Sequence, residues 1–190
     1  MLDKVSSCLL FLYGLLYQAF VPCLVPELLP ANTVDHQQYL GKWYFKATVS
    51  PRESDIQKFK DLDNMWISME QPANDTLLVT GHMRRGDDCI TQIWTYFIHP
   101  ERDDVEMEGR PKRRTLLWSG KWANCSECII FQEVEPPLKE TDSEDSLNRY
   151  LLYGRQGDVD HEVVKAFLEN MSCHNVLASV RLPQEKEFCT

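Results

Sequence analysis

The segment from Ile90 to His99 carries side chains that could line a ligand cavity. Alternate residues of a strand point to opposite faces, so one face carries Ile90, Gln92, Trp94, Tyr96 and Ile98. A face that combines glutamine, tryptophan and tyrosine is unusual for a dry core but suits a cavity wall that accepts a polar ligand. The alternative interpretation is that Trp94 and Tyr96 are ordinary core residues, which is the more common use of such rings.

No other group of reactive residues has the spacing of a catalytic or metal site. Cys125 and Cys128 could form a redox pair or half of a zinc site, but no second pair with suitable spacing and no nearby histidine accompanies them. There is no Ser/His/Asp signature and no glycine-rich phosphate loop, and the histidines are scattered: His36, His82, His99, His161 and His174. This pattern favours a binding protein that is not an enzyme and needs no metal or cofactor.

The composition is that of one folded, acidic domain. The chain has 190 residues, of which 43% are hydrophobic and 26% charged, and both shares are ordinary for a globular protein. An aromatic content of 11% excludes disorder as the dominant state. The net charge of −9 excludes a general electrostatic affinity for nucleic acid. The single long apolar run, at the N-terminus, excludes a polytopic membrane protein.

Short segments rich in aromatic and branched residues predict an all-β domain. They are separated by turn signals such as Gly-Asp-Asp and Gly-Arg-Pro, and eight strands at this spacing favour an antiparallel barrel or sandwich. A Pro-rich, irregular arm over residues 23–40 precedes them. The expected strands are Lys42–Val49, Met65–Glu70, Thr76–Arg84, Ile90–His99, Asp104–Glu108, Thr115–Lys121, Cys128–Val134 and Ser146–Tyr153.

One segment after the last of these strands has the period of a helix. Asp158 could cap it, and the apolar residues that follow at helical spacing form one stripe: Val159, Val163, Val164, Phe167, Leu168 and Met171. A short final strand is expected over Val176–Arg181. The predicted order is therefore an irregular arm, eight strands, one C-terminal helix and a short extra strand.

The N-terminus has the layout of a secretory signal. Lys4 precedes an apolar stretch from Val5 to Val25. Bulky residues and Pro22 stand where a signal peptidase prefers small residues. Two interpretations fit: cleavage near residues 19–23, or retention of residues 1–22 as a hydrophobic anchor.

The cysteines and glycosylation motifs agree with export. Six cysteines follow the apolar run, and six allow 15 connectivities. Asn-x-Ser/Thr motifs occur at Asn74, Asn124 and Asn170, which are candidate glycosylation sites. Together these features favour a secreted, oxidised glycoprotein.

Two motifs at opposite ends of the strand region resemble the lipocalins. Gly41-Lys42-Trp43 opens the first strand, and Arg155 follows the last one. In the lipocalins the corresponding Trp plugs the closed end of the barrel, and the Arg lies across its ring in a cation–π contact. The resemblance implies an eight-stranded antiparallel up-and-down barrel, with Gly41, Trp43 and Arg155 as structural residues. The second short lipocalin motif, a Thr-Asp-Tyr turn, is absent, which marks an outlying branch.

Within the lipocalins the chain resembles the apolipoprotein M family over residues 23–189. The matching segments are Leu40–Phe45, Glu108–Pro111 and Arg149–Tyr153. Members of that family are secreted, keep the uncleaved signal sequence as a lipid anchor, ride on high-density lipoprotein and carry sphingosine-1-phosphate. The resemblance therefore implies a retained anchor over residues 1–22 and a lipocalin domain over residues 23–190.

The same resemblance implies a set of ligand contacts. The family's calyx holds the phosphate and amino-alcohol head of the lipid, and the matching positions here are Trp94, Tyr96, Arg110, Glu133, Arg149 and Tyr153. A further family arginine is replaced by Gln92, which removes one charged phosphate donor. Two Arg forks can bind a phosphate, Glu133 suits the ammonium, and each buried CH₂ of the tail contributes about 0.8 kcal/mol.

Simpler interpretations stand beside this set. Arg149 could pair with a surface acid, and Glu133 could be a solvated strand end. The basic cluster Arg110–Arg114 could be a solvated turn, a proprotein-convertase site or a positive rim at the barrel mouth. A turn with a rim effect is favoured, because a strand is expected directly after it.

The family also implies the disulfide pairing. It pairs Cys23 with Cys173 and Cys89 with Cys189, while its third bond joins Cys125 to a helix cysteine that is Val163 here. The third bond expected is therefore Cys125–Cys128.

Two rival functions remain: a carrier of another small lipid, such as a retinoid or fatty acid, without phosphate selectivity, and an enzyme that uses a free cavity thiol.

Overall fold

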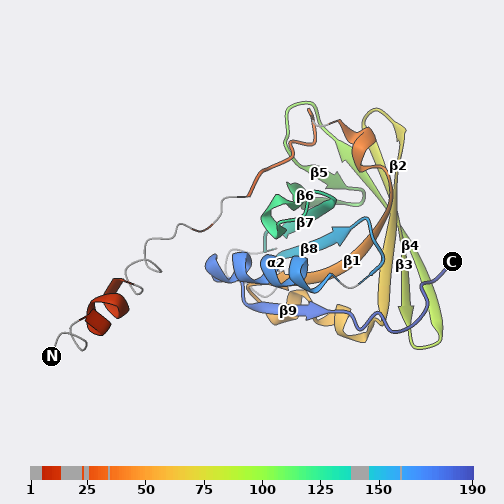
Figure 1. Cartoon of the computed structure of the whole chain (residues 1–190). Helices are drawn as coiled ribbons and strands as arrows, with labels where there is room; N and C mark the ends of the chain where they lie inside the picture. The colour runs from red at the N-terminus through yellow and green to blue at the C-terminus, as the bar shows by residue number, and fades with distance from the viewer. Residues whose placement is uncertain (1–5, 14–22, 24–25, 34, 138–145, 159) are drawn as a thin grey trace.

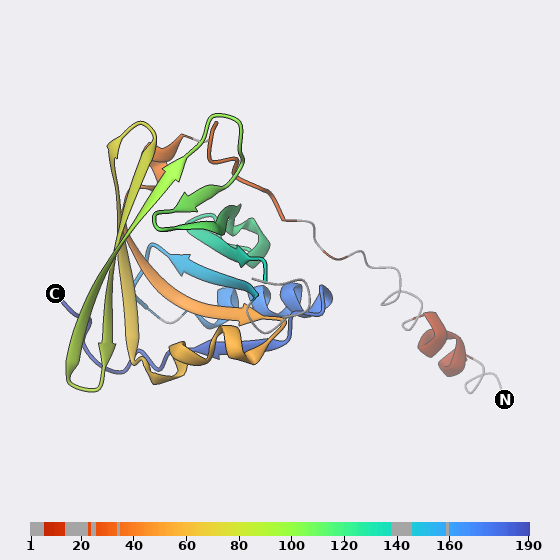
Figure 2. The same ribbon diagram turned by 180° about the vertical axis from the view of Figure 1, so that it is seen from behind.

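The protein is built around one nine-stranded sheet that closes on itself. The computed structural model describes residues 6–13, 23, 26–33, 35–137, 146–158 and 160–190. The strand order is β2-β3-β4-β5-β6-β7-β8-β1-β9, and an additional β1–β2 pairing closes the first eight strands into a barrel (Figure 1 and, from behind, Figure 2). All the pairings with a given register are antiparallel, and neighbours along the chain pair from β1 to β8. The expected all-β, up-and-down barrel is confirmed.

The strands follow the predicted segments closely, and one helix follows the barrel. The structure also has short 3-10 helices η1 (His36–Tyr39), η2 (Glu53–Asp55), η3 (Gln57–Asp61) and η4 (Gly120–Ala123). Alternating burial in the strands, as in β3, places one set of side chains inside the barrel. The strands are β1 (Gly41–Ser50), β2 (Asn64–Ala73), β3 (Thr76–Arg85), β4 (Asp88–Ile98), β5 (Val105–Met107), β6 (Arg110–Ser119), β7 (Cys128–Glu135), β8 (Leu147–Gly154) and β9 (Ala178–Arg181).

The basic cluster Arg110–Arg114 is part of β6, so its interpretation as a turn was wrong. The turn is only Glu108 and Gly109, because Met107 of β5 already pairs with Arg110. Gly109 has a φ of +73°, which favours glycine because side chains with a Cβ are strained there. The turn is shorter than the sequence suggested, and β6 starts five residues earlier.

The helix α2 (His161–Cys173) begins two residues later than predicted. Its N-cap is Asp160, whose side chain accepts a hydrogen bond from the Val163 amide. Asp158, the predicted cap, instead offers its carbonyl to the buried Lys46 ammonium. Val159 lies outside the described residues. β9 also starts two residues after its predicted beginning.

Two apolar clusters divide the interior. One lies inside the barrel and includes Phe45, Ile67 and Ile129. The other lies between α2 and the outer face of the barrel, where Phe167 and Met171 are fully buried with Trp122 of η4. The sheet therefore has apolar residues on both faces of β1, β7 and β8, with the helix covering the outer one (Figure 1).

The closed end of the barrel has the geometry that the lipocalin resemblance implied. The Arg155 guanidinium lies 3.6 Å from the centre of the Trp43 ring and donates hydrogen bonds to the carbonyls of Gln38 and Lys42. The Trp43 indole donates to the Tyr39 carbonyl at 2.8 Å. Gly41 has a φ of +89°, so a residue with a Cβ would be strained where β1 begins. These contacts close this end of the barrel.

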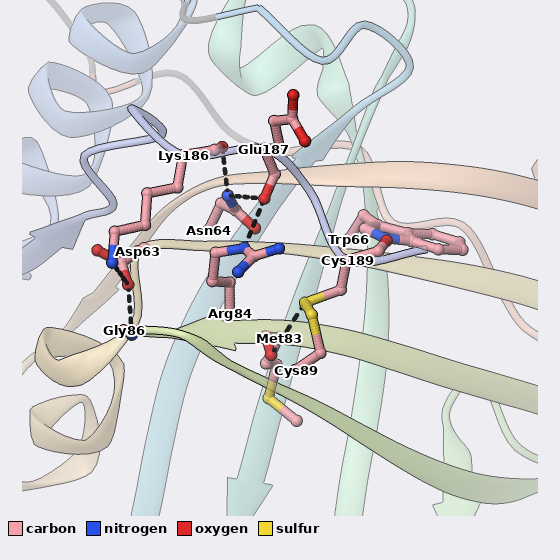
Figure 3. Close-up of a disulfide and its surroundings, with 10 residues drawn as sticks. All are labelled: Asp63, Asn64, Trp66, Met83, Arg84, Gly86, Cys89, Lys186, Glu187 and Cys189. Carbon is pink, nitrogen blue, oxygen red and sulfur yellow. Dashed lines mark hydrogen bonds and ion pairs between the residues drawn. A yellow bond between two sulfur atoms is a disulfide. The ribbon is translucent and has the colours of Figure 1, made fainter.

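Three disulfides tie the peripheral segments to the barrel. Cys23 is bonded to Cys173, Cys89 to Cys189 and Cys125 to Cys128, which are the three pairs expected. The first joins the N-terminal arm to the end of α2. The second joins the C-terminal tail to β4, and this tail crosses the outside of β2 and β3 (Figure 3).

The N-terminal segment is described only in part. Residues 6–13 are helical, and Leu9, Leu10 and Phe11 on this helix are exposed. The cleavage region discussed above lies mostly in residues 14–22, outside the described residues. Within the described part of the chain, no helix combines the length and apolarity needed to cross a membrane.

Candidate functional site

The barrel encloses a cavity of about 230 Å³ that combines an apolar wall with a polar end. Ile67, Val79 and Leu151 supply part of the apolar wall. Five of the six predicted contacts line it: Trp94, Tyr96, Glu133, Arg149 and Tyr153. The volume is below the range of about 300–1,000 Å³ for small-molecule sites, so a long ligand has to extend through the mouth.

The face of β4 that the sequence singled out does face this cavity. Ile90, Gln92, Trp94 and Tyr96 all line it. Tyr96 is buried, and burial raises the pKa of its hydroxyl well above the usual value. Burial likewise raises the pKa of Tyr153. Both phenols therefore present neutral hydroxyl groups at physiological pH.

At the polar end, Arg149 and Glu133 are bonded to each other. The two residues are opposite one another in the β7–β8 ladder, and both Nε and Nη2 of Arg149 donate to the same Glu133 oxygen, Nε at 2.7 Å. Their side chains are only 6% and 10% exposed. The simpler interpretations of the sequence were that Arg149 pairs with a surface acid and that Glu133 is a solvated strand end. The structure instead buries the pair, which is neutral as a whole.

The loop between β1 and β2 covers this pair. The third guanidinium nitrogen of Arg149 donates to the Asp55 carbonyl at 3.1 Å, and the Phe59 ring lies 5.2 Å from the guanidinium carbon. The Asp55 carboxylate accepts hydrogen bonds from the Ser50 hydroxyl and the Asn148 amide. These bonds fix η2 and η3 against β1 and β8, at the mouth of the barrel.

Arg110 lies outside the cavity, in a second and more polar hollow at the mouth. This hollow, about 330 Å³ in volume, is lined by Arg110 and Arg113 of β6, by Gln92 and Trp94 of β4, and by Lys58. The Arg110 side chain is 55% exposed and stands 3.5 Å from Glu135. Arg113 donates two hydrogen bonds to the same Glu135 carboxylate, at 2.8 and 2.6 Å. We call this second hollow the vestibule.

Lys58 and Phe59 are site residues that the sequence did not reveal. They belong to η3, between β1 and β2, where the sequence has no strand or helix period. Lys58 lines both the cavity and the vestibule. Loss of hydration and the nearby Arg149 lower its pKa to about 8. Only the clustering of Lys58 and Lys60 in an otherwise unassigned loop could have drawn attention to this position.

The described residues hold no arrangement typical of catalysis by metal or thiol. No group of three or more His, Cys, Asp or Glu side chains among them could hold a metal ion. The cysteines at positions 23, 89, 125, 128, 173 and 189 are all in disulfides. The alternative of an enzyme with a free thiol in the cavity therefore lacks its nucleophile among these six residues.

The sequence over its full length matches a known family. A family model described as the ApoM domain matches residues 1–190. The chain belongs to the apolipoprotein M family. Apolipoprotein M of Rattus norvegicus is 30% identical over 198 residues, which cover 100% of this chain and 97% of the relative. Apolipoprotein M of Mus musculus is 29% identical with the same coverage.

Solved structures show that this member of the apolipoprotein M family has the lipocalin fold. Siderocalin Q83 superimposes with a TM-score of 0.64 at 18% identity, over 82% of this chain and 95% of that one. The siderocalin Ex-FABP gives a TM-score of 0.61 at 14% identity, over 80% and 95%. Lipocalin 12 from rat epididymis gives 0.60 at 13% identity, over 80% and 87%. The family and the lipocalin fold together support a lipid-binding carrier.

Gly81 gives the Trp94 ring its place in the cavity wall of this family member. A Cβ built on Gly81 would stand 2.5 Å from Cζ3 and 2.7 Å from Cη2 of Trp94. Gly81→Ala should therefore push the indole into the cavity and weaken lipid binding about tenfold, while the fold survives. Calorimetric titration with a long-chain lipid measures the affinity, and tryptophan emission reports the displacement. Thr80→Val, on the other face of β3, is the control, and equal affinity in both variants would contradict the prediction.

Proposed function

We propose that the protein carries sphingosine-1-phosphate in plasma, as a component of high-density lipoprotein. The observation that supports this most directly is the cavity with an apolar wall and a buried Arg149–Glu133 pair at its polar end. A lipid that carries both a phosphate and an ammonium is the natural partner for a guanidinium beside a carboxylate. The phosphate would accept hydrogen bonds from Arg149 and Arg110, and the ammonium would face Glu133.

The energetics assign affinity and selectivity to different parts of the ligand. The apolar wall favours the long chain, because each buried CH₂ contributes about 0.8 kcal/mol. Exchanging the Arg149–Glu133 pair for contacts with a zwitterionic head keeps both buried charges compensated. A ligand without these charges leaves the protein pair intact and gains nothing from it. The head group therefore acts mainly as a selector.

We further propose that residues 1–22 are retained as the anchor to the lipoprotein surface. The exposed Leu9, Leu10 and Phe11 of the helix over residues 6–13 offer an apolar surface of the kind that inserts into lipid. The disulfides suit a secreted protein. Asn74 and Asn124 are exposed and open to glycosylation, whereas the Asn170 amide donates to the Trp122 carbonyl at 2.5 Å. N-terminal sequencing of the secreted protein tests retention.

The test of the ligand uses the full chain secreted by cultured cells. Native mass spectrometry should detect sphingosine-1-phosphate bound at one molecule per chain. In competition, sphingosine-1-phosphate should displace unphosphorylated sphingosine far more readily than the reverse. Arg110→Ala should reduce this preference several-fold without a change in melting temperature, because its side chain is largely exposed. Absence of any sphingoid lipid from the secreted protein, with no binding on titration, would refute the proposal.

A carrier of another small lipid, such as a retinoid or a fatty acid, is the second candidate. It is favoured by the mutual neutralisation of Arg149 and Glu133 and by the uncharged Gln92 in the cavity wall. Such a carrier would bind phosphorylated and unphosphorylated lipids alike. Equal affinity of the full chain for sphingosine and sphingosine-1-phosphate would therefore select this candidate over the first.

A further inference from the structure

Lys58 stands at the junction of the two hollows of the binding site. It lines the apolar cavity beside Arg149 and Glu133, and it also lines the vestibule beside Arg110 and Arg113. Among the described residues, no other cationic side chain lines both. Lys58 therefore lies where a head group that reaches from the cavity into the vestibule would meet a cation.

Lys58 also differs from Arg110, Arg113 and Arg149 in having no carboxylate partner among the described residues. In the cavity lining it shares this property with Arg85, which does not line the vestibule. Arg149 is bonded to Glu133, and Arg110 and Arg113 both stand within 4 Å of Glu135. Within the described part of the chain, the Lys58 ammonium makes no ion pair, and its recorded contact is with the Phe59 ring at 5.5 Å. An anion that binds to an unpaired cation gains more binding free energy than one that binds to a paired cation, because the existing ion pair must first be broken.

We propose that Lys58 is the residue that selects a phosphorylated head group, by donating to the phosphate at the junction of cavity and vestibule. This inference rests on the proposed function and names a residue that neither the sequence motifs nor the family resemblance assigned. Gln92, which carries no charge, lines the same two hollows as Lys58. The arginines then orient the head and contribute part of the selectivity, and Lys58 adds a further contact that only the phosphorylated head can make.

The test compares the full-length wild type with Lys58→Gln, Lys58→Arg and Lys60→Gln. Lys60 is the matched control, because it lies two residues further along η3 and pairs with Glu53 instead of lining the site. The quantity measured is the ratio of the dissociation constants for sphingosine and sphingosine-1-phosphate. Loss of a charge-assisted hydrogen bond at this exposed position should lower the ratio about tenfold in Lys58→Gln. Lys60→Gln should keep the wild-type ratio, and Lys58→Arg most of it.

A pH series gives an independent readout. The pKa of Lys58 is lowered to about 8 by loss of hydration and by Arg149, Arg113 and Arg110, against the opposing effect of Glu133. The free protein therefore loses this charge between pH 7 and 9, and the wild-type ratio should fall as pH rises. Bound phosphate holds the proton, so the midpoint should lie above 8. In Lys58→Arg the ratio should depend less on pH, because arginine stays protonated. The ionisation of the two lipids themselves is the same in both experiments, so it does not affect the comparison between wild type and variant.

The outcomes separate the inference from the proposed function. A wild type that prefers the phosphorylated lipid, together with an unchanged ratio in Lys58→Gln, overturns the role of Lys58 and leaves the carrier function standing. A wild type that binds neither lipid, or binds both equally, overturns the proposed function and this inference with it. A tenfold loss that is equally large in Lys60→Gln would show a general charge effect and also overturn the inference.

Discussion

Replacing Glu133 with glutamine should destabilise the barrel by about 3–5 kcal/mol, the usual cost of leaving one partner of a buried ion pair without its counter-charge. The Arg149 side chain is only 6% exposed, so water compensates little for the lost carboxylate. Its remaining partner is the Asp55 carbonyl, which carries no net charge. Urea denaturation followed by tryptophan fluorescence measures the difference in the free energy of unfolding.

Glu135→Gln is the matched control for this substitution. Glu135 lies two residues further along β7 and pairs with Arg113 and Arg110 at the mouth, where water reaches the site more freely. Its loss should cost about 1 kcal/mol or less. A comparable loss in both variants would show that burial of the Arg149–Glu133 pair has no special weight in this barrel.

Removing both charges of the buried pair should restore the stability that the single substitution loses. In the double variant Glu133→Leu with Arg149→Met, apolar side chains of similar size fill the polar end of the cavity, and such replacements are often neutral or stabilising. The double variant should fold, bind long-chain lipids and lose its preference for a charged head group. A double variant that still prefers sphingosine-1-phosphate as strongly as the wild type would contradict the assignment of the head group to this pair.

Loss of the Cys89–Cys189 disulfide should destabilise the protein much more than loss of the Cys125–Cys128 disulfide. The first closes a sequence separation of 100 residues and the second a separation of 3. In the chain-entropy model a loop of about 100 residues corresponds to about 4–5 kcal/mol, and very short loops to about 1–2 kcal/mol. The variants to compare are Cys89→Ala with Cys189→Ala, and Cys125→Ala with Cys128→Ala. Each pair removes one buried and one more exposed cysteine.

The C-terminal tail adds a second reason for the larger effect. Side chains of β2 and β3 hold its backbone: the Asn64 amide donates to the Lys186 carbonyl at 2.7 Å, the Trp66 indole to Cys189 at 2.7 Å and the Arg84 guanidinium to Glu187 at 2.6 Å (Figure 3). Without the disulfide these bonds must hold the tail alone. Thermal melts of the two double variants give the measurement, and equal losses in both would refute the dependence on loop length.

Much of the architecture could be predicted from the sequence, because it depends on local patterns such as strand alternation and short motifs. Alternation placed Gln92, Trp94 and Tyr96 on one face of β4, and all three line the cavity in the structure. Of the three, Tyr96 is buried, Trp94 half-buried and Gln92 exposed. The lipocalin resemblance at Gly41, Trp43 and Arg155 implied the closed end, where the cation–π contact is present. Errors of two to five residues arose where a turn or cap depends on tertiary contacts, as at Arg110 and Asp160.

The sequence determined the antiparallel strands and the mixed polar and apolar face of β4, because a period of two is a property of each strand by itself. The strand pattern left a barrel and a sandwich open, and the lipocalin resemblance implied the barrel. Only the tertiary structure decided how the charges at its mouth are distributed. Arg149 and Glu133 are 16 residues apart and meet because of the β7–β8 register. Lys58 reaches the mouth because the hydrogen bonds of Asp55 fold its loop across the barrel. No periodicity predicts such contacts, since they depend on where strands and loops distant in sequence come to lie in the closed sheet.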